Sequence, residues 1–204
     1  RDAFTQQFGV NTYGSLEEIL AMPDIEGVII TAPNEQHFSI AKQIAEAGKH
    51  VYTEKPISNI LADGLRMEML QKKHDIIMTV GHSARLLKGI QMMKEYLDNG
   101  SLGKLSFIEA NFSNERALEL TPDTWRWYRD RAPGGPLSQL AIHMFDILHY
   151  LGGDVEGVSS IASKLSPVGA EVDDQSMSTV RFKNGVVGYV GSCWTSPGIF
   201  STRV

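Results

Sequence analysis

The chain has 204 residues, of which 42% are hydrophobic and 21% are charged, so it is long enough to bury a sizeable core. Its formal net charge is −5, and Lys and Arg are scattered, which argues against nucleic acid or an anionic membrane as a partner. The single cysteine, Cys193, excludes an intrachain disulfide, and no apolar run approaches the roughly 20 residues that span a bilayer. We therefore predict a globular cytoplasmic protein without a membrane segment.

The first residues predict two short helices and a buried strand. The opening RDAFTQQFG is typical of the end of a helix that stops at Gly9, so we expect the chain to begin inside a larger domain. Ser15 and Glu18 form a capping-box pattern for a second helix to about Met22. The continuous apolar run at residues 27–30 then predicts a strand buried on both faces, as in a parallel sheet.

Helices and strands alternate from there to about residue 100. The predicted elements are a helix over 37–47 ending at Gly48, a strand at 51–53, a helix over 60–73, a strand over 76–80 and a helix over 85–97. This order predicts a Rossmann-like, doubly wound α/β domain over residues 1–102, with its N-terminal part missing. In such a fold the ligand crevice lies at the carboxyl ends of the strands.

The pattern changes near residues 100–103, where we place a domain boundary. Alternating apolar and polar residues predict strands over 105–112, 158–165, 176–182 and 186–194, and one helix over 137–151. Asn184-Gly185 suits the hairpin turn between the last two strands. We therefore predict a second, α+β domain over residues 103–204, with a mostly antiparallel open sheet that is incomplete at its C-terminal end.

Three turns that follow predicted strands carry candidate site residues: TAPNEQH (31–37), TEKP (53–56) and GHSAR (81–85). The carboxyl ends of parallel strands meet at one edge, so these turns should lie side by side. The alternative is that Pro33, Asn34 and Pro56 only form turns and that Lys55 is a solvated charge.

The helix over 137–151 carries a polar stripe opposite its apolar face. The stripe consists of Gln139, His143, Asp146 and Tyr150. One alternative is a structural His143 bonded to Asp146, and another is a zinc site that also uses His149. At roughly 100° per residue His143 and His149 point about 120° apart and cannot both face one ion without ligands from elsewhere. We therefore predict no metal site.

Together these segments resemble the glucose-fructose oxidoreductase and inositol dehydrogenase family, Gfo/Idh/MocA. The matching motifs, in order over essentially the whole chain, are TAPNEQH, EAGKHVYTEKP, VGHSAR and TWRWYRDRAPGGPLSQLAIHMFDILHYLGG. The resemblance implies a Rossmann domain that binds NAD or NADP, and a sheet domain that contacts substrate and forms a homo-oligomer, a dimer or tetramer. The fingerprint G-x-G-x-x-G is absent, so we expect an interior piece of a longer protein.

The resemblance also implies roles for individual residues. Lys55 would hold the reacting oxygen, Pro56, often preceded by a cis bond, would fix its direction, and His143 would carry the proton. The implied catalytic set is Lys55, His143 and Gln139. The implied cofactor-binding residues are Thr31, Pro33, Asn34, His37, Glu54, Lys55, Trp125 and Arg126, and the implied substrate-binding residues are Lys55, Arg85, Tyr128 and His143, with others near Trp194. Gln139 replaces the family's aspartate and cannot take up a proton.

We therefore expect an NAD(P)-dependent oxidoreductase that moves hydride between a nicotinamide cofactor and a secondary alcohol or ketone of a sugar, sugar derivative or cyclitol. Gln139 motivates an alternative, a non-redox homologue that uses held NAD for glycoside cleavage or only binds it. A third hypothesis is that this piece alone is an inert scaffold, because the pyrophosphate would lack its helix N-terminus.

Overall fold

The computed structural model describes residues 2–204, so Arg1, at the start of the predicted first helix, lies outside the described residues. The chain divides into two compact units, the first comprising residues up to 32 together with 36–81, and the second residues 33–35 and 82–204. This division falls earlier in the chain than the predicted boundary near residues 100–103, because α5 (Lys88–Asp98) packs against α6 (Ile142–Gly152) within the second unit.

The first unit contains a three-stranded parallel sheet in the order β1-β2-β3. Its elements are α1 (Asp2–Phe8), α2 (Leu16–Leu20), β1 (Gly27–Ile30), α3 (His37–Glu46), β2 (His50–Thr53), α4 (Leu61–His74) and β3 (Met78–Val80). Ile44 of α3 and Met67 of α4 are fully buried in one cluster with Ile30 and Val51 of the sheet. Both helices therefore cover the same face, and the predicted Rossmann-like alternation of parallel strands and helices is confirmed.

The other face of this sheet is open, which corrects one prediction. Strand β1 was expected to be buried on both faces, but Ile29 is 69% exposed, and Tyr52 and Ile77 are exposed as well. Side chains of a strand point alternately to opposite faces, and among the described residues α3 and α4 supply cover on one face only.

Two predicted helix ends, the stop at Gly48 and the cap at Ser15, are confirmed. Gly48 has φ +71° after α3, and its N–H donates to Ala45 O at 2.9 Å, as in a left-handed helix cap. At the start of α2 the Ser15 hydroxyl accepts from Glu18 N at 3.3 Å. The return bond differs from a capping box, because the Glu18 carboxylate accepts from Gly14 N at 2.9 Å.

The second unit holds a five-stranded sheet in the order β5-β6-β7-β4-β8. Its strands are β4 (Phe107–Ser113), β5 (Val155–Ser163), β6 (Gln175–Phe182), β7 (Val187–Cys193) and β8 (Ile199–Arg203). The β6–β7 hairpin turns at Gly185, φ +88°, as predicted. The sheet is mostly antiparallel, but β4 pairs with β7 in parallel, and β8 was not predicted.

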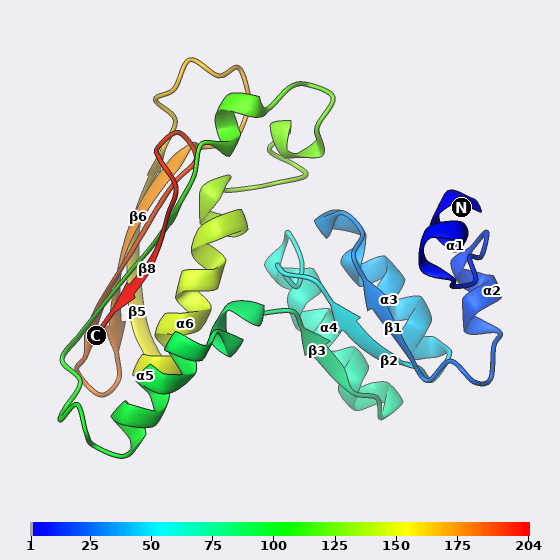
Figure 1. The fold of residues 1–204 in the computed structure, drawn as a ribbon, viewed down its shortest axis with the longest axis horizontal. Coiled ribbons are helices and arrows are strands. Elements are labelled where there is room, and N and C mark those ends of the chain that lie inside the picture. Colours follow the sequence, from blue (N-terminus) through cyan, green and yellow to red (C-terminus); the bar gives the residue numbers. More distant parts are fainter. Residues whose placement is uncertain (1) are drawn as a thin grey trace. The chain divides into compact units, whose positions relative to one another are not determined.

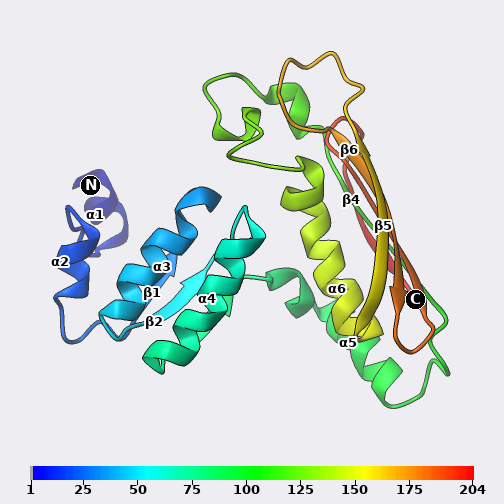
Figure 2. The same ribbon diagram turned by 180° about the vertical axis from the view of Figure 1, so that it is seen from behind.

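Helix α6 forms the core of this unit by lying along one face of the sheet, as Figure 1 and, from behind, Figure 2 show. Its residues Met144, Ile147 and Leu148 are at most 1% exposed and share a cluster with Ile108 of β4 and Phe182 of β6. Burying such side chains contributes about 1.5–3 kcal/mol each. None of the helices in residues 2–204 is long and apolar enough to cross a membrane.

Two predicted helices are each divided into two segments. The helix over 137–151 begins as a five-residue π-helix, Leu137–Ala141, and only then continues as α6. The helix over 85–97 begins as the 3-10 segment η2, Ser83–Leu86, and resumes as α5 after Leu87, whose ψ of 132° is extended. The periodicity of the apolar residues is continuous across both breaks, so it does not reveal them.

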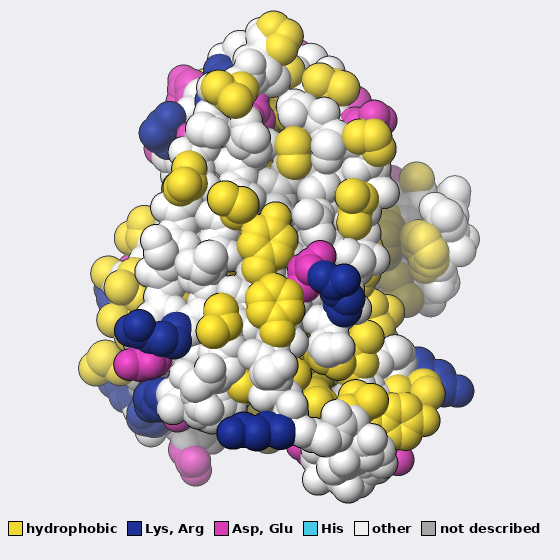
Figure 3. Space-filling view, turned by 90° about the vertical axis from the view of Figure 1, so that its left-hand side faces the viewer, with side chains coloured by type: hydrophobic (Ala, Val, Ile, Leu, Met, Phe, Trp, Pro, Cys, Tyr) yellow, Lys and Arg dark blue, Asp and Glu magenta, His cyan; other side chains and the backbone are white. Residues whose placement is uncertain are grey.

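The opposite face of the five-stranded sheet is open. Figure 3 shows hydrophobic side chains gathered along it, with only a few charged groups between them. Apolar residues whose side chains point to this face are Phe107, Ile161, Met177, Val187 and Ile199, each between 43% and 66% exposed. A hollow of about 390 Å³ lies in the same face, with Asn111, Met177 and Tyr189 in its lining.

Replacing Gly48 by alanine should lower the free energy of unfolding by about 1 kcal/mol, because an L side chain is strained at φ +71°. No neighbouring atom lies within 4 Å of a Cβ at this position, so the loss would be conformational rather than steric. Urea unfolding of both proteins measures the change.

Gly89→Ala is the matched control. A Cβ at Gly89 also meets nothing within 4 Å, but this glycine lies in α5 with negative φ. We expect it to raise the free energy of unfolding by up to about 1 kcal/mol. Equal effects of the two substitutions would contradict the conformational explanation.

Candidate active site

The three predicted turns begin at the same edge of the parallel sheet. Ile30 pairs with Thr53, and Thr53 pairs with Val80, so β1, β2 and β3 end level with one another. The ladder continues into the turns, because Glu54 N donates to Ile30 O at 3.0 Å and Gly81 N donates to Thr53 O at 2.8 Å. The parallel register therefore places the residues that follow each strand side by side.

The turn after β1 offers polar groups to a ligand. Thr31 is exposed and Pro33 is half-buried. Asn34 begins the 3-10 segment η1 (Asn34–Gln36) and is only 6% exposed, yet its side-chain Nδ2 has no hydrogen-bond partner among the described residues. A buried amide that lacks an acceptor is costly, so this donor fits the oxygen of a bound ligand.

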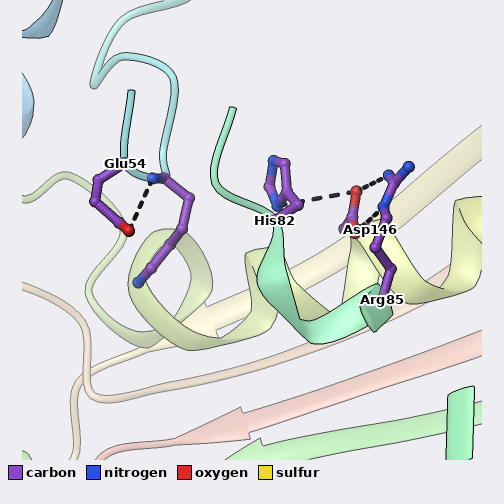
Figure 4. A network of polar contacts seen from close by, with 5 residues as sticks. Glu54, His82, Arg85 and Asp146 are labelled. Atoms are coloured by element: carbon purple, nitrogen blue, oxygen red, sulfur yellow. Dashed lines mark hydrogen bonds and ion pairs between the residues drawn. The ribbon is translucent and has the colours of Figure 1, made fainter. Parts of the chain in front are cut away.

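The turn after β2 presents Lys55 at the carboxyl edge of the sheet. The Lys55–Pro56 peptide bond is cis, as the resemblance implies. Figure 4 shows Glu54 turned back toward the backbone nitrogen of Lys55, which donates to the Glu54 carboxylate at 3.3 Å. Lys55 and Glu54 are both half-buried, whereas Pro56 is buried. Lys55 is thus held at a turn, not on a freely solvated helix face.

His37, a cofactor-binding residue by resemblance, is turned into the first unit. It is the first residue of α3 and is fully buried. Its Nδ1 lies 2.9 Å from Pro56 O and its Nε2 lies 2.9 Å from Ala32 O. Both ring nitrogens therefore face backbone oxygens of this unit.

The polar stripe of the second unit starts in the π-helical segment. Gln139 is 5% exposed there, and its Nε2 donates to the Ser138 hydroxyl at 3.4 Å. His143, in the first turn of α6, is half-buried, with its ring centroid 5.8 Å from that of Phe112. Gly135 must be glycine, because a Cβ on it would lie 2.1 Å from the backbone oxygen of Asp173.

Asp146, on the same stripe, is bound to Arg85 of η2. Arg85 Nε donates to Asp146 Oδ2 at 2.8 Å, and Arg85 Nη2 donates to Oδ1. The hydrogen bonds that Arg85 donates to Asp146 raise the pKa of Arg85 above its ordinary value, although partial burial opposes the shift. Figure 4 shows His82 on the other side of this carboxylate, with its Nδ1 3.9 Å from Asp146 Oδ1.

Sequence reasoning missed this ion pair, whose residues are 61 positions apart. The available signal was chemical: an arginine directly after a predicted strand and an aspartate on the polar face of a largely buried helix each needed an opposite charge. Arg85 therefore binds both oxygens of the carboxylate that the sequence offered as one alternative partner for His143.

The long loop before α6 holds the remaining predicted residues. Trp125 and Arg126 lie in the 3-10 segment η4 (Trp125–Trp127), with the guanidinium 4.2 Å from the centre of the Trp125 ring. Burial, and secondarily the nearby charge of Arg116, lowers the pKa of Arg126. The Tyr128 hydroxyl donates to Pro122 O at 2.9 Å. Trp194, 1% exposed, packs in a buried cluster, and its Nε1 has no partner among residues 2–204.

The predicted site residues thus fall into separate groups. The structure brings Thr31, His37, Glu54 and Lys55 to one edge of the first unit. In the second unit, Gln139 and His143 follow one another along the π-helix and α6, whereas Trp125, Arg126 and Tyr128 lie on the loop. Within the described part of the chain, no group of three or more His, Cys, Asp or Glu side chains is placed to hold a metal ion.

A parallel α/β unit followed by an open, mostly antiparallel sheet is the architecture of a Rossmann-type nucleotide-binding oxidoreductase with a second sheet domain. Residues 1–82 match the oxidoreductase family with an NAD-binding Rossmann fold, and residues 90–204 match the GFO/IDH/MocA C-terminal domain. The chain belongs to the Gfo/Idh/MocA family.

Named relatives agree with this assignment. Levoglucosan dehydrogenase of Pseudarthrobacter phenanthrenivorans is 31% identical over 91% of this chain and 54% of the relative. Myo-inositol 2-dehydrogenase of Thermotoga maritima is 30% identical over 91% of this chain and 55% of the relative. The chain therefore spans about half the length of these curated relatives.

Solved structures share the fold. A protein from Desulfitobacterium hafniense superposes with a TM-score of 0.93 at 39% identity, over 99% of this chain and 58% of that protein. Levoglucosan dehydrogenase in complex with NADH and levoglucosan superposes with a TM-score of 0.91 at 28% identity, over 98% of this chain and 57% of that protein.

Replacing Arg85 by alanine should lower the free energy of unfolding by about 2–3 kcal/mol. The Asp146 side chain is 8% exposed and would keep its charge without the guanidinium that compensates it. Denaturant unfolding of the wild type, Arg85→Ala, Asp146→Asn and the double variant measures the coupling between the two residues.

Arg181→Ala is the matched control, because Arg181 pairs with Glu156 and both side chains are more than half exposed. This change should cost about 0–1 kcal/mol. A loss equal to that of Arg85→Ala, or the absence of coupling between Arg85 and Asp146, would contradict the assigned ion pair.

Proposed function

We propose that the full-length protein is an NAD(P)-dependent oxidoreductase acting on a secondary alcohol or ketone of a sugar, sugar derivative or cyclitol. The observation that carries the proposal is the position of Lys55, half-buried in the turn after β2 at the carboxyl edge of a parallel sheet. This edge is where doubly wound folds bind their ligands. The names of two relatives, levoglucosan dehydrogenase and myo-inositol 2-dehydrogenase, support a sugar derivative or cyclitol as substrate.

The residues present fit a dinucleotide cofactor. Asn34 has a buried amide donor without a partner in the described chain, and such a donor suits a ribose or phosphate oxygen. The residues proposed to hold the cofactor are Thr31, Pro33, Asn34, Glu54, Lys55, Trp125 and Arg126. When bound, the nicotinamide accepts or donates the hydride.

Lys55 has the chemistry to handle the substrate oxygen. Its ammonium donates a hydrogen bond to that oxygen, stabilises negative charge on it and exchanges a proton with it. The half-burial of Lys55 strengthens this interaction, because a charge acts more strongly where water is partly excluded. We assign to Lys55 the roles of substrate-binding and catalytic residue.

His143 is proposed as the proton carrier beside the substrate, because imidazole can both accept and donate a proton near neutral pH. Gln139, four positions earlier, can orient a neighbour by hydrogen bonds but cannot exchange a proton. Tyr128 is a further proposed substrate contact. Arg85 donates from Nε and from Nη2 to Asp146, so a substrate contact would use the N–H groups of Nη1 or the second N–H of Nη2.

A second candidate function is favoured by Gln139. Without a carboxylate at this position, the protein would use held NAD for glycoside cleavage without net redox change, or would only bind it. Release of a sugar without accumulation of reduced coenzyme would support this function, whereas net NAD(P)H formation would exclude it.

We also propose that the protein is a dimer or tetramer formed through the open face of the five-stranded sheet. The apolar side chains on this face are unusually exposed for a monomer, with Met177 50% and Val187 46% exposed. A cytoplasmic location stays a prediction, supported by the single cysteine.

In the full-length protein, Lys55→Ala should lower kcat by about 100- to 10,000-fold, a larger effect than its weakening of coenzyme binding, because the lysine acts on the reacting oxygen as well as holding the cofactor. The measurement combines a substrate panel of sugars and cyclitols, tested with NAD and with NADP, and calorimetric titration of each coenzyme. Failure of the unmutated protein to bind either coenzyme would refute the proposed function.

Lys72→Ala serves as the control, since Lys72 lies on the exposed face of α4 in an ion pair with Glu68. This variant should retain the wild-type kcat. A Lys55→Ala protein with wild-type kcat would remove Lys55 from catalysis while leaving the oxidoreductase assignment intact.

Met177→Asp should shift the full-length protein toward smaller species in sedimentation, because a buried charge at the interface lacks a partner. Leu61→Asp is the control, since Leu61 is 80% exposed at the start of α4, outside the sheet face. An unchanged sedimentation profile for Met177→Asp would exclude this face as the interface.

A further inference from the structure

His37 connects the two turns that follow β1 and β2. Its Nε2 contacts the carbonyl oxygen of Ala32, in the turn after β1, and its Nδ1 contacts that of Pro56, in the turn after β2, both at 2.9 Å. The two oxygens are five and nineteen residues away in sequence. One buried ring therefore spans the carboxyl edge of two neighbouring strands.

The burial of His37 argues against direct contact with a cofactor. Its side chain is 0% exposed, and neither ring nitrogen is left facing away from the two carbonyls. A ligand would have to displace a backbone acceptor to reach the ring, and each displaced carbonyl would lose a buried hydrogen bond. The structural position therefore suits a residue that holds other groups in place.

The two acceptors are adjacent to the groups that matter most in the proposed site. Pro56 is bonded directly to Lys55, so the position of its carbonyl bears on the direction of the lysine side chain. Ala32 directly precedes Pro33 and Asn34 of the proposed cofactor turn. Small displacements of groups that position a substrate or cofactor slow catalysis, since a shift of about 1 Å can lower the reaction rate about 100-fold.

We propose that His37 is a positioning residue: its Nδ1 contact fixes the Lys55–Pro56 turn, and its Nε2 contact fixes the turn that holds the cofactor. The proposal rests on the proposed function, because it takes Lys55 as the residue that acts on the substrate oxygen. One side chain thus has two effects: its contact with Pro56 acts on the turnover rate, and its contact with Ala32 acts on the coenzyme affinity.

The two contacts can be separated by substitution. Neutral imidazole carries one N–H, and the doubly protonated ring carries two, so the ring can donate to one carbonyl or to both. An asparagine amide can place its nitrogen near the position of Nδ1, and a glutamine amide can place its nitrogen near that of Nε2. His37→Asn thus retains a donor for Pro56, His37→Gln retains one for Ala32, and His37→Phe retains neither.

The experiment measures kcat and the KM for coenzyme in full-length protein, for the wild type and these three variants. We expect His37→Asn to keep kcat within about threefold while its coenzyme KM rises about tenfold or more, and His37→Gln to show the reverse. His37→Phe should show both losses. The control is His149→Asn, which replaces an exposed histidine in the last turn of α6 and should change neither value.

Several outcomes would overturn the proposal. Wild-type kinetics in all three variants would overturn it. So would the same fall in kcat and the same rise in coenzyme KM in His37→Asn and in His37→Gln, when both variants melt at the wild-type temperature. If the variants do not fold, the ring N–H signals of His37 in the unmutated protein decide. A slowly exchanging ring N–H supports the buried contacts, and the absence of any such signal overturns them.

Measurements on the wild type distinguish failure of the proposed function from failure of the positioning role. An unmutated protein that neither binds coenzyme nor turns over a sugar or cyclitol refutes the proposed function, and the positioning role falls with it. An active wild type with variants that do not split kcat from KM refutes the positioning role alone.

Discussion

The parallel pairing of β1, β2 and β3 is the constraint on which the candidate site depends. Parallel strands run in one direction, so each strand ends at the same edge of the sheet and is followed there by a turn. The bonds from Glu54 N to Ile30 O and from Gly81 N to Thr53 O carry this pairing one residue beyond the strands. Segments that are more than twenty residues apart in sequence are thereby placed side by side.

Much of this arrangement could be predicted from local signals. Gly48 ends a helix and Gly185 closes a hairpin because each takes a positive φ that other residues resist. The order of apolar runs and helical periods predicts the α/β unit, and the alternation after residue 105 predicts most of the second sheet. The candidate turns followed from one further rule, that ligands bind beyond the carboxyl ends of parallel strands.

The rest could not be predicted because it depends on contacts between distant residues. The Arg85–Asp146 ion pair and the His37–Pro56 contact have no periodic signal, since each joins side chains to groups 61 and 19 residues away. The open face at Ile29 depends on which helices cover the sheet, and β8 depends on a partner strand that comes 86 residues earlier, as the pairing of Ser113 with Ile199 shows. Such features require the folded arrangement.

The π-helical segment Leu137–Ala141 has a consequence for how this part of the chain can change. A π turn holds one residue more than an α turn, so it behaves like a single-residue insertion within a continuous helix. Deleting one residue there would restore α geometry while the segment before it keeps nearly the same direction relative to α6, because the wide turn already accommodates the extra residue. This segment should therefore tolerate the loss of one residue better than a regular α-helix does, since an α-helix that loses a residue turns its two flanks by about 100° relative to one another.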